Sequence, residues 1–145
     1  MIKRLALVIC LVTCLVGCER SLKVGLDGKN PPTFRFDGSG DLQRVAICEI
    51  TPDGKLPPYG SGFWVLIPRG DVNASKSSTV TYGLIPEGFY QTVPSSGSPP
   101  PLQEGKIYAF GAETRGAHGG DVWFTIRNGQ SVTVRKTDPA DPDTR

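Results

Sequence analysis

Histidine and cysteine, which supply most transition-metal ligands and many catalytic bases and nucleophiles, are scarce in this sequence. Its 145 residues contain one histidine, His118, and four cysteines. No second histidine accompanies His118, and the scattered carboxylates follow no familiar metal-ligand spacing. The sequence therefore predicts neither a metal site nor any other cofactor.

Long apolar stretches are also rare, and the one clear example is residues 5–16. A helix of that length spans about 18 Å, well short of a hydrocarbon core of about 30 Å, so we do not expect a permanent membrane span. The stretch follows Lys3 and Arg4 and ends before the small residue Gly17. A basic start, an apolar middle and a small residue at the end are the order of a secretory signal peptide.

The last four residues of this signal are Leu15-Val16-Gly17-Cys18, which resemble the lipobox of bacterial lipoproteins. The resemblance implies cleavage between Gly17 and Cys18 and attachment of a diacylglyceryl group and a further acyl chain, such as palmitate, to Cys18. Two or more acyl chains give stable anchoring where one is marginal. Residues 1–17 would then be a signal peptide, and the mature protein would be anchored in the bacterial cell envelope. Glu19, in place of the aspartate that signals inner-membrane retention, favours the outer membrane, facing the periplasm or the exterior.

No excess of positive charge remains after removal of this signal. Lys3 and Arg4 account for two of the 16 basic residues, so 14 basic residues balance the 14 acidic ones. A nucleic-acid-binding protein normally carries a basic face or stripe. We therefore expect no nucleic-acid partner; the expected partners are the membrane, through the lipid, and an envelope protein or a glycan.

Cys48 is the one thiol left once Cys10 and Cys14 are removed and Cys18 is lipidated, so no intramolecular disulfide is expected. It lies in residues 44–50, an apolar run that predicts a strand covered on both faces. A buried free cysteine usually behaves as a small hydrophobic side chain. We interpret Cys48 in this way, with a catalytic nucleophile or an intermolecular bridge as alternatives.

Glycine and proline, 18 and 13 residues, separate short apolar or alternating runs, as turns do in an all-β domain. Asn128-Gly129 between two such runs is a strong hairpin signal. The pattern predicts about eight short strands and hence a sandwich or a small barrel. The expected strands are residues 33–36, 44–50, 62–67, 79–82, 89–93, 106–112, 121–126 and 131–135.

Residues 102–110 resemble the tyrosine corner of fibronectin type III and immunoglobulin-like domains, with Leu102, Gly105 and Tyr108 before and at the start of the penultimate strand. In those domains the tyrosine hydroxyl bonds back to the main chain, which implies a structural role for Tyr108. The resemblance favours a single antiparallel β-sandwich, with Trp64 as a core anchor in the densest apolar run.

The domain organisation follows from these assignments. We predict a signal peptide over residues 1–17, a lipidated cysteine and flexible tether over 18–32, the β-sandwich over 33–136 and a disordered tail over 137–145. Asp71 to Ser78 is expected to be a polar loop.

Catalysis has little support in the sequence. His118 lies in a glycine-rich loop, where Asp121 could orient it and Ser61 could serve as a nucleophile. Ser61, however, lacks the first glycine of a nucleophile elbow and the following helix. We therefore predict a non-enzymatic binding or structural domain with His118 and Asp121 in a possible binding loop. The alternatives are a periplasmic inhibitor of a lytic enzyme, similar to the lipoproteins that inhibit lysozyme, and a hydrolase that uses Ser61 and His118.

The lipobox gives a direct prediction. Cys18→Ala removes the thiol that would accept the diacylglyceryl group, so we expect it to abolish labelling by radioactive palmitate and to release the protein from the membrane fraction. A Cys48→Ala variant should label like the wild type. Undiminished labelling of Cys18→Ala would show that the lipobox interpretation is wrong.

Overall fold

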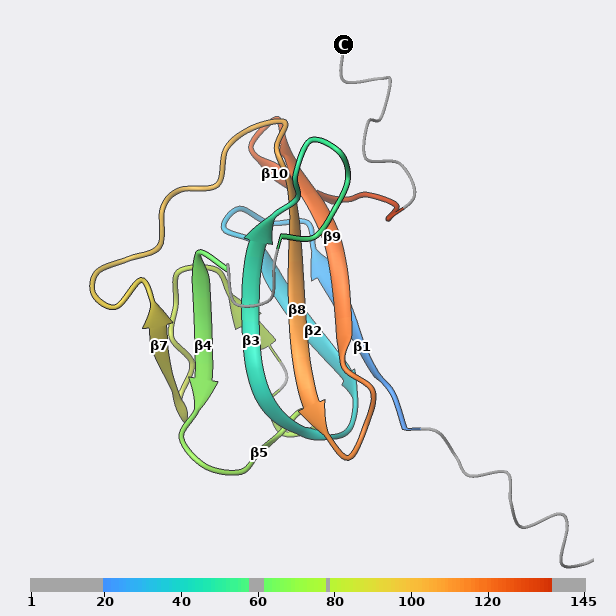
Figure 1. Ribbon diagram of the computed structural model, residues 1–145, viewed down its shortest axis with the longest axis vertical. Coiled ribbons are helices and arrows are strands. Elements are labelled where there is room, and N and C mark those ends of the chain that lie inside the picture. Colours follow the sequence, from blue (N-terminus) through green and yellow to red (C-terminus); the bar gives the residue numbers. More distant parts are fainter. Residues whose placement is uncertain (1–19, 58–61, 78, 137–145) are drawn as a thin grey trace, which may run out of the picture.

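The computed structural model describes residues 20–57, 62–77 and 79–136, which form a β-sandwich without helices (Figure 1). The predicted all-β class is therefore confirmed. The strands of the described ranges are β1 (Leu22–Asp27), β2 (Thr33–Gly38), β3 (Asp41–Glu49), β4 (Trp64–Pro68), β5 (Val72–Asn73), β6 (Thr79–Thr81), β7 (Phe89–Val93), β8 (Ile107–Arg115), β9 (Gly120–Arg127) and β10 (Gln130–Thr133).

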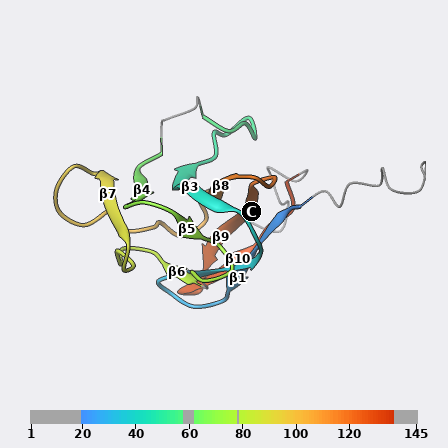
Figure 2. The same ribbon diagram turned by 90° about the horizontal axis from the view of Figure 1, so that it is seen from below.

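The strands form two antiparallel sheets that pack face to face. The smaller sheet has the order β1-β2-β6, and the larger has the order β10-β9-β8-β3-β4-β7, with β5 also paired to β3. Figure 2 shows the two layers, with β3, β4 and β8 in the upper one and β1 and β6 in the lower one. The order resembles that of immunoglobulin and fibronectin type III domains, where strands A, B and E share one sheet and C, F and G the other. In this correspondence β8 occupies the place of strand F, and Tyr108 is the second residue of β8, at the start of the strand as the tyrosine-corner resemblance predicts.

Aromatic contacts join the two sheets in the core. Phe34 of β2 stacks on Phe110 of β8 with ring centroids 3.8 Å apart, and Phe34 also meets the edge of Phe124 in β9. Trp64 is fully buried, as predicted, and its indole N–H donates to Gln91 Oε1 over 2.9 Å. In the described ranges, the remaining fully buried large side chains are Leu42, Val45, Ile47, Leu66, Val80 and Pro32.

Tyr108 makes the hydrogen bond that the tyrosine-corner resemblance implies. Its side chain is buried, and its hydroxyl accepts a hydrogen bond of 2.9 Å from the backbone N–H of Gln103. The bond fixes the segment before β8 to the start of that strand. Tyr108 is therefore a structural residue in the fold.

The expected flexible tether over residues 18–32 is wrong from residue 22 onward, because Leu22–Asp27 form β1 and pair with the whole of β2. Leu22 is buried and Val24 and Leu26 pack against the core, while the residues between them point away. This alternation is the ordinary pattern of a strand with one covered face. The sandwich therefore begins at residue 22 and not at residue 33.

The eight expected strands all occur, with small shifts at their ends. The polar loop predicted over residues 71–78 is wrong in part, since it contains the short strand β5. The hairpin prediction at β9 and β10 is confirmed: Asn128 and Gly129 have φ values of 51° and 71°, the left-handed pair that a type I′ turn needs. Residues 1–19 and 137–145, assigned to the signal, the lipidated cysteine and the tail, lie outside the described residues.

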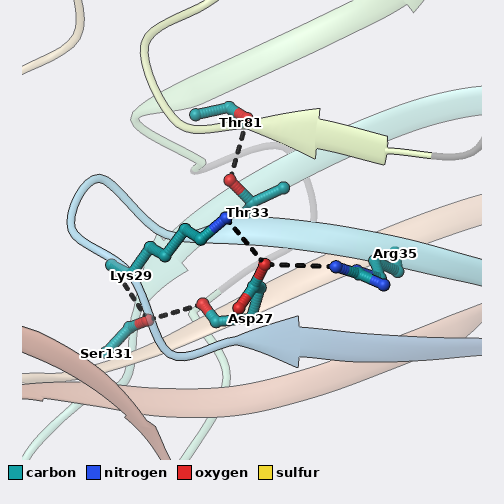
Figure 3. A network of polar contacts seen from close by, with 6 residues as sticks. All are labelled: Asp27, Lys29, Thr33, Arg35, Thr81 and Ser131. Carbon is teal, nitrogen blue, oxygen red and sulfur yellow. Dashed lines mark hydrogen bonds and ion pairs between the residues drawn. The ribbon is translucent and has the colours of Figure 1, made fainter.

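A polar network closes one end of the sandwich (Figure 3). The Asp27 carboxylate lies 3.3 Å from both Lys29 Nζ and Arg35. Ser131 of β10 is buried, and its hydroxyl lies 3.1 Å from the carbonyl of Asp27 and 2.7 Å from that of Lys29. Ser131 therefore joins an edge strand of the larger sheet to the β1–β2 turn of the smaller one.

Removal of this hydroxyl should weaken the contact between the sheets. We expect Ser131→Ala to lower the free energy of unfolding by about 1–2 kcal/mol, because the two carbonyls share the one proton of this hydroxyl at a part-buried junction and the variant leaves neither bonded to it. In thermal denaturation this corresponds to a fall in Tm of about 3–8 °C. The matched control is Ser98→Ala, which changes an exposed loop serine. Equal Tm values for the two variants would contradict the role given to Ser131.

Candidate functional site

Four small residues cover the centre of the outer face of the larger sheet, the face turned away from the smaller sheet. Ala46 and Cys48 lie on β3, and Ala109 and Gly111 lie on β8. Their strand neighbours Val45, Ile47, Tyr108 and Phe110 belong to the core, so alternation places these four residues outward. The register sets Ala46 opposite Gly111 and Cys48 opposite Ala109. Four small residues, one of them a glycine, are thus contiguous across two central strands.

A groove of about 300 Å³ lies over this small-residue floor. The half-exposed Leu56, from the loop after β3, forms one wall. Ala112, Glu113, Gly119, Gly120 and Asp121 complete the lining. The volume is at the lower end of the range for small-molecule sites, and such sites are typically apolar with a few polar groups. The strands that carry the groove, β3, β8 and β9, lie in front of β1 and β2 in Figure 1.

Gly111 leaves open space on the floor of the groove, because it has no side chain to fill it. A Cβ atom at this position would have no other atom within 4 Å, and its φ is outside the left-handed region. By contrast, a Cβ at Gly119 or Gly120 would overlap the carbonyl oxygen of Ala112 or Leu22. The fold therefore requires Gly119 and Gly120 to lack side chains, but it does not require this of Gly111. Glycine inside a strand weakens the strand and often marks a place that a ligand or another backbone approaches closely.

Cys48 supplies the only thiol in the described residues, and it faces this groove. The residue is partly exposed, so the expectation that its strand is covered on both faces is confirmed only in part. The main core covers one face, and the other face carries the groove beside a smaller buried cluster of Ile50, Ala109 and Trp123. Burial raises the pKa of the Cys48 thiol, which keeps it protonated and weakly nucleophilic at neutral pH. This agrees with the interpretation of Cys48 as a packing residue.

Both charged residues that line the groove are acidic, and each has a basic partner. Glu113 Oε1 lies 3.1 Å from Arg44 Nη1, and Asp121 Oδ1 lies 2.7 Å from Lys136 Nζ. Gly111 is opposite Asp121 in the β8–β9 register, and Glu113 is two residues further along β8. The two carboxylates are therefore diagonal neighbours on one sheet face, about 7–8 Å apart at the backbone. Arg44 and Lys136 are not among the lining residues.

His118 lies in the turn between β8 and β9, and its main chain binds the N-terminal segment. The N–H of His118 donates to the carbonyl of Arg20, and the N–H of Leu22 donates to the carbonyl of His118, each over 2.9 Å. Its side chain is exposed, whereas Asp121, predicted to share a binding loop with it, lines the groove. Ser61, Gly17 and Cys18 lie outside the described residues, so the Ser61–His118 hydrolase and the lipidation site remain predictions.

Sequence reasoning missed the groove because its floor carries no motif. A signal was present in β8, where Ala109 and Gly111 alternate with the large side chains of Tyr108 and Phe110. On an ordinary exposed strand face, β-branched or polar residues are more common. Two consecutive outward positions with almost no side chain thus predict a hollow.

Neither comparison with known proteins nor the arrangement of possible metal ligands assigns a function to the groove. No family model, curated protein or solved structure matches the chain. Within residues 20–57, 62–77 and 79–136, no group of three or more His, Cys, Asp or Glu residues is placed to hold a metal ion. The same ranges contain no helix long and apolar enough to cross a membrane.

The contrast between the glycines gives a prediction about stability. Gly111→Val should leave the free energy of unfolding unchanged or raise it by up to about 1 kcal/mol, because the side chain has room and strands favour valine. Gly120→Ala should lower it by about 1–3 kcal/mol, because the new Cβ displaces the main chain of Leu22. Urea denaturation measures both changes. A large loss of stability in Gly111→Val would show that the fold itself requires that glycine.

Proposed function

We propose that this protein is a lipid-anchored component of the bacterial cell envelope that binds a ligand, without catalysis, in the groove over Ala46, Cys48, Ala109 and Gly111. The anchor is the lipid on Cys18, in the outer membrane. The binding function is carried by one observation, the open space at Gly111. A glycine that its own fold does not need, in a central strand and on the floor of a groove, is explained if a ligand occupies the space of its missing side chain.

The course of β1 supports a short anchor. Because β1 begins at Leu22, only Glu19, Arg20 and Ser21 separate it from Cys18. A chain of three residues spans at most about 11 Å. The main-chain bonds between residues 20–22 and His118 place the start of β1 beside Gly119, at one end of the groove. A lipid on Cys18 would therefore hold this end of the groove close to the membrane surface.

Photo-crosslinking in living cells tests the binding function for a ligand of any chemical class. A photoreactive amino acid replaces Leu56, which lines the groove and is 56% exposed. We expect illumination to give a covalent adduct that is visible by mass spectrometry. Gly111→Val, which fills the floor, should abolish this adduct.

The matched control is Gly25→Val. Gly25 is also a strand glycine with no atom within 4 Å of a built Cβ, but it lies on β1 in the other sheet. This variant should give the adduct at the wild-type level. An adduct that persists in Gly111→Val would contradict binding in the groove, and a protein adduct that is a lytic enzyme would favour the inhibitor alternative.

A further inference from the structure

The charge of the groove indicates which class of ligand it takes. The floor is apolar, and the two charged residues of the lining are Glu113 and Asp121, at the same end as Gly119 and Gly120. An apolar site with a few placed polar groups uses those groups to orient its ligand. A carboxylate at one end of an apolar groove is complementary to a cationic group on an apolar body and repels an anionic one.

The two carboxylates differ in how firmly their present partners are held. The Arg44 side chain is 16% exposed and lies beside Glu113 on the neighbouring strand, so its ion pair is part of the sheet. The Lys136 side chain is 57% exposed and comes from the segment that follows β10. An exposed lysine pair contributes little to stability and costs side-chain entropy, so a competing cation can displace Lys136 from Asp121.

We propose that the groove binds a small amphipathic cation, with its apolar part on Ala46, Cys48, Ala109 and Gly111 and its positive group on Asp121 in place of Lys136. This proposal rests on the groove being a binding site, as inferred above. A volume of about 300 Å³ corresponds to roughly ten non-hydrogen atoms at about 30 Å³ each. An eight-carbon chain with one terminal amine therefore fills it.

Cys48 provides the measurement. In the processed, lipidated chain Cys48 is the only free thiol, because Cys10 and Cys14 leave with the signal and Cys18 carries the lipid. The full-length protein is expressed, and open membrane fragments are treated with a water-soluble methanethiosulfonate, which reacts with thiols but not with amines. The pH is mildly alkaline, where octylamine stays protonated and the raised pKa of the thiol still permits reaction. The rate of modification is then followed in the presence of octylamine, octanol or octanoate. A Cys48→Ala variant measures modification at any other thiol.

In the wild type, we expect octylamine to slow the modification of Cys48 at about threefold lower concentration than octanol, the difference typical of a partly exposed ion pair, with octanoate weakest. Asp121→Asn should remove the advantage of octylamine over octanol. Lys136→Ala, which removes the competing ammonium, should lower the octylamine concentration required by about threefold. Comparison of variants in the same membranes cancels the partition of each compound into lipid.

The two proposals fail in different ways. Equal protection by octylamine and octanol, with Gly111→Val abolishing both and Gly25→Val abolishing neither, would overturn the cationic ligand and leave the groove as an apolar binding site. An unchanged octylamine response in Lys136→Ala would overturn the displacement of Lys136. Absence of protection by all three compounds, together with a wild-type rate of modification in Gly111→Val, would overturn the groove as a binding site.

Discussion

The stacking of Phe34 on Phe110 is the contact on which the arrangement of the larger sheet depends. The two rings are fully buried, 3.8 Å apart and nearly parallel, and they come from different sheets. A ring of this size buried from water contributes about 1.5–3 kcal/mol, which is a large part of the stability of a small domain. The contact therefore fixes which face of β8 points inward. Because side chains alternate along a strand, an inward Phe110 makes Ala109 and Gly111 point outward.

Because side chains alternate along β3 and β8, the inward and outward positions of these two central strands have different roles. The inner positions of β3 and β8 hold the aromatic and branched side chains that join the sheets, and the hydroxyl of Tyr108 and the hydroxyl of Ser131 fix the chain around them. The side chains at the outer positions point away from the smaller sheet and do not pack against it. Small residues there lower the β-propensity of the strands but remove no contact between the two sheets, and Ala109 and Cys48 pack instead in a smaller cluster with Ile50 and Trp123. A groove can thus occupy the middle of the sheet without removing a contact between the two sheets.

The fold was largely predictable from the sequence, because its signals are local. Asn128-Gly129, the dense apolar run around Trp64 and the segment that leads to Tyr108 each specify a turn, a core strand or a corner within a few residues. The strand β1 was missed because Pro31 and Pro32 and the polar residues before them suggested a linker. Its alternating Leu22, Val24 and Leu26 carried the opposite and correct signal.

The candidate site was not predictable in the same way. Sequence reasoning selected His118, because it is rare, whereas the groove is defined by an unfilled volume over residues that have almost no chemistry of their own. Gly111 can be distinguished from Gly119 and Gly120 only by what surrounds each of them in space. Asp121 was selected, but as a partner for His118; its meaning depends on the register that sets it opposite Gly111.

The early start of β1 changes what a lipid on Cys18 would do. A tether over residues 18–32 would allow the domain to move up to about 50 Å from the membrane. With β1 beginning at Leu22, three residues allow about 11 Å, close to the Debye length of about 8 Å at physiological salt. The surface charge of the membrane would then act on the domain. The groove end beside Gly119 would be within reach of amphipathic molecules that concentrate at the membrane surface. The proposed anchor on Cys18 and the apolar, acidic groove would therefore fit the same environment, the boundary between lipid and water.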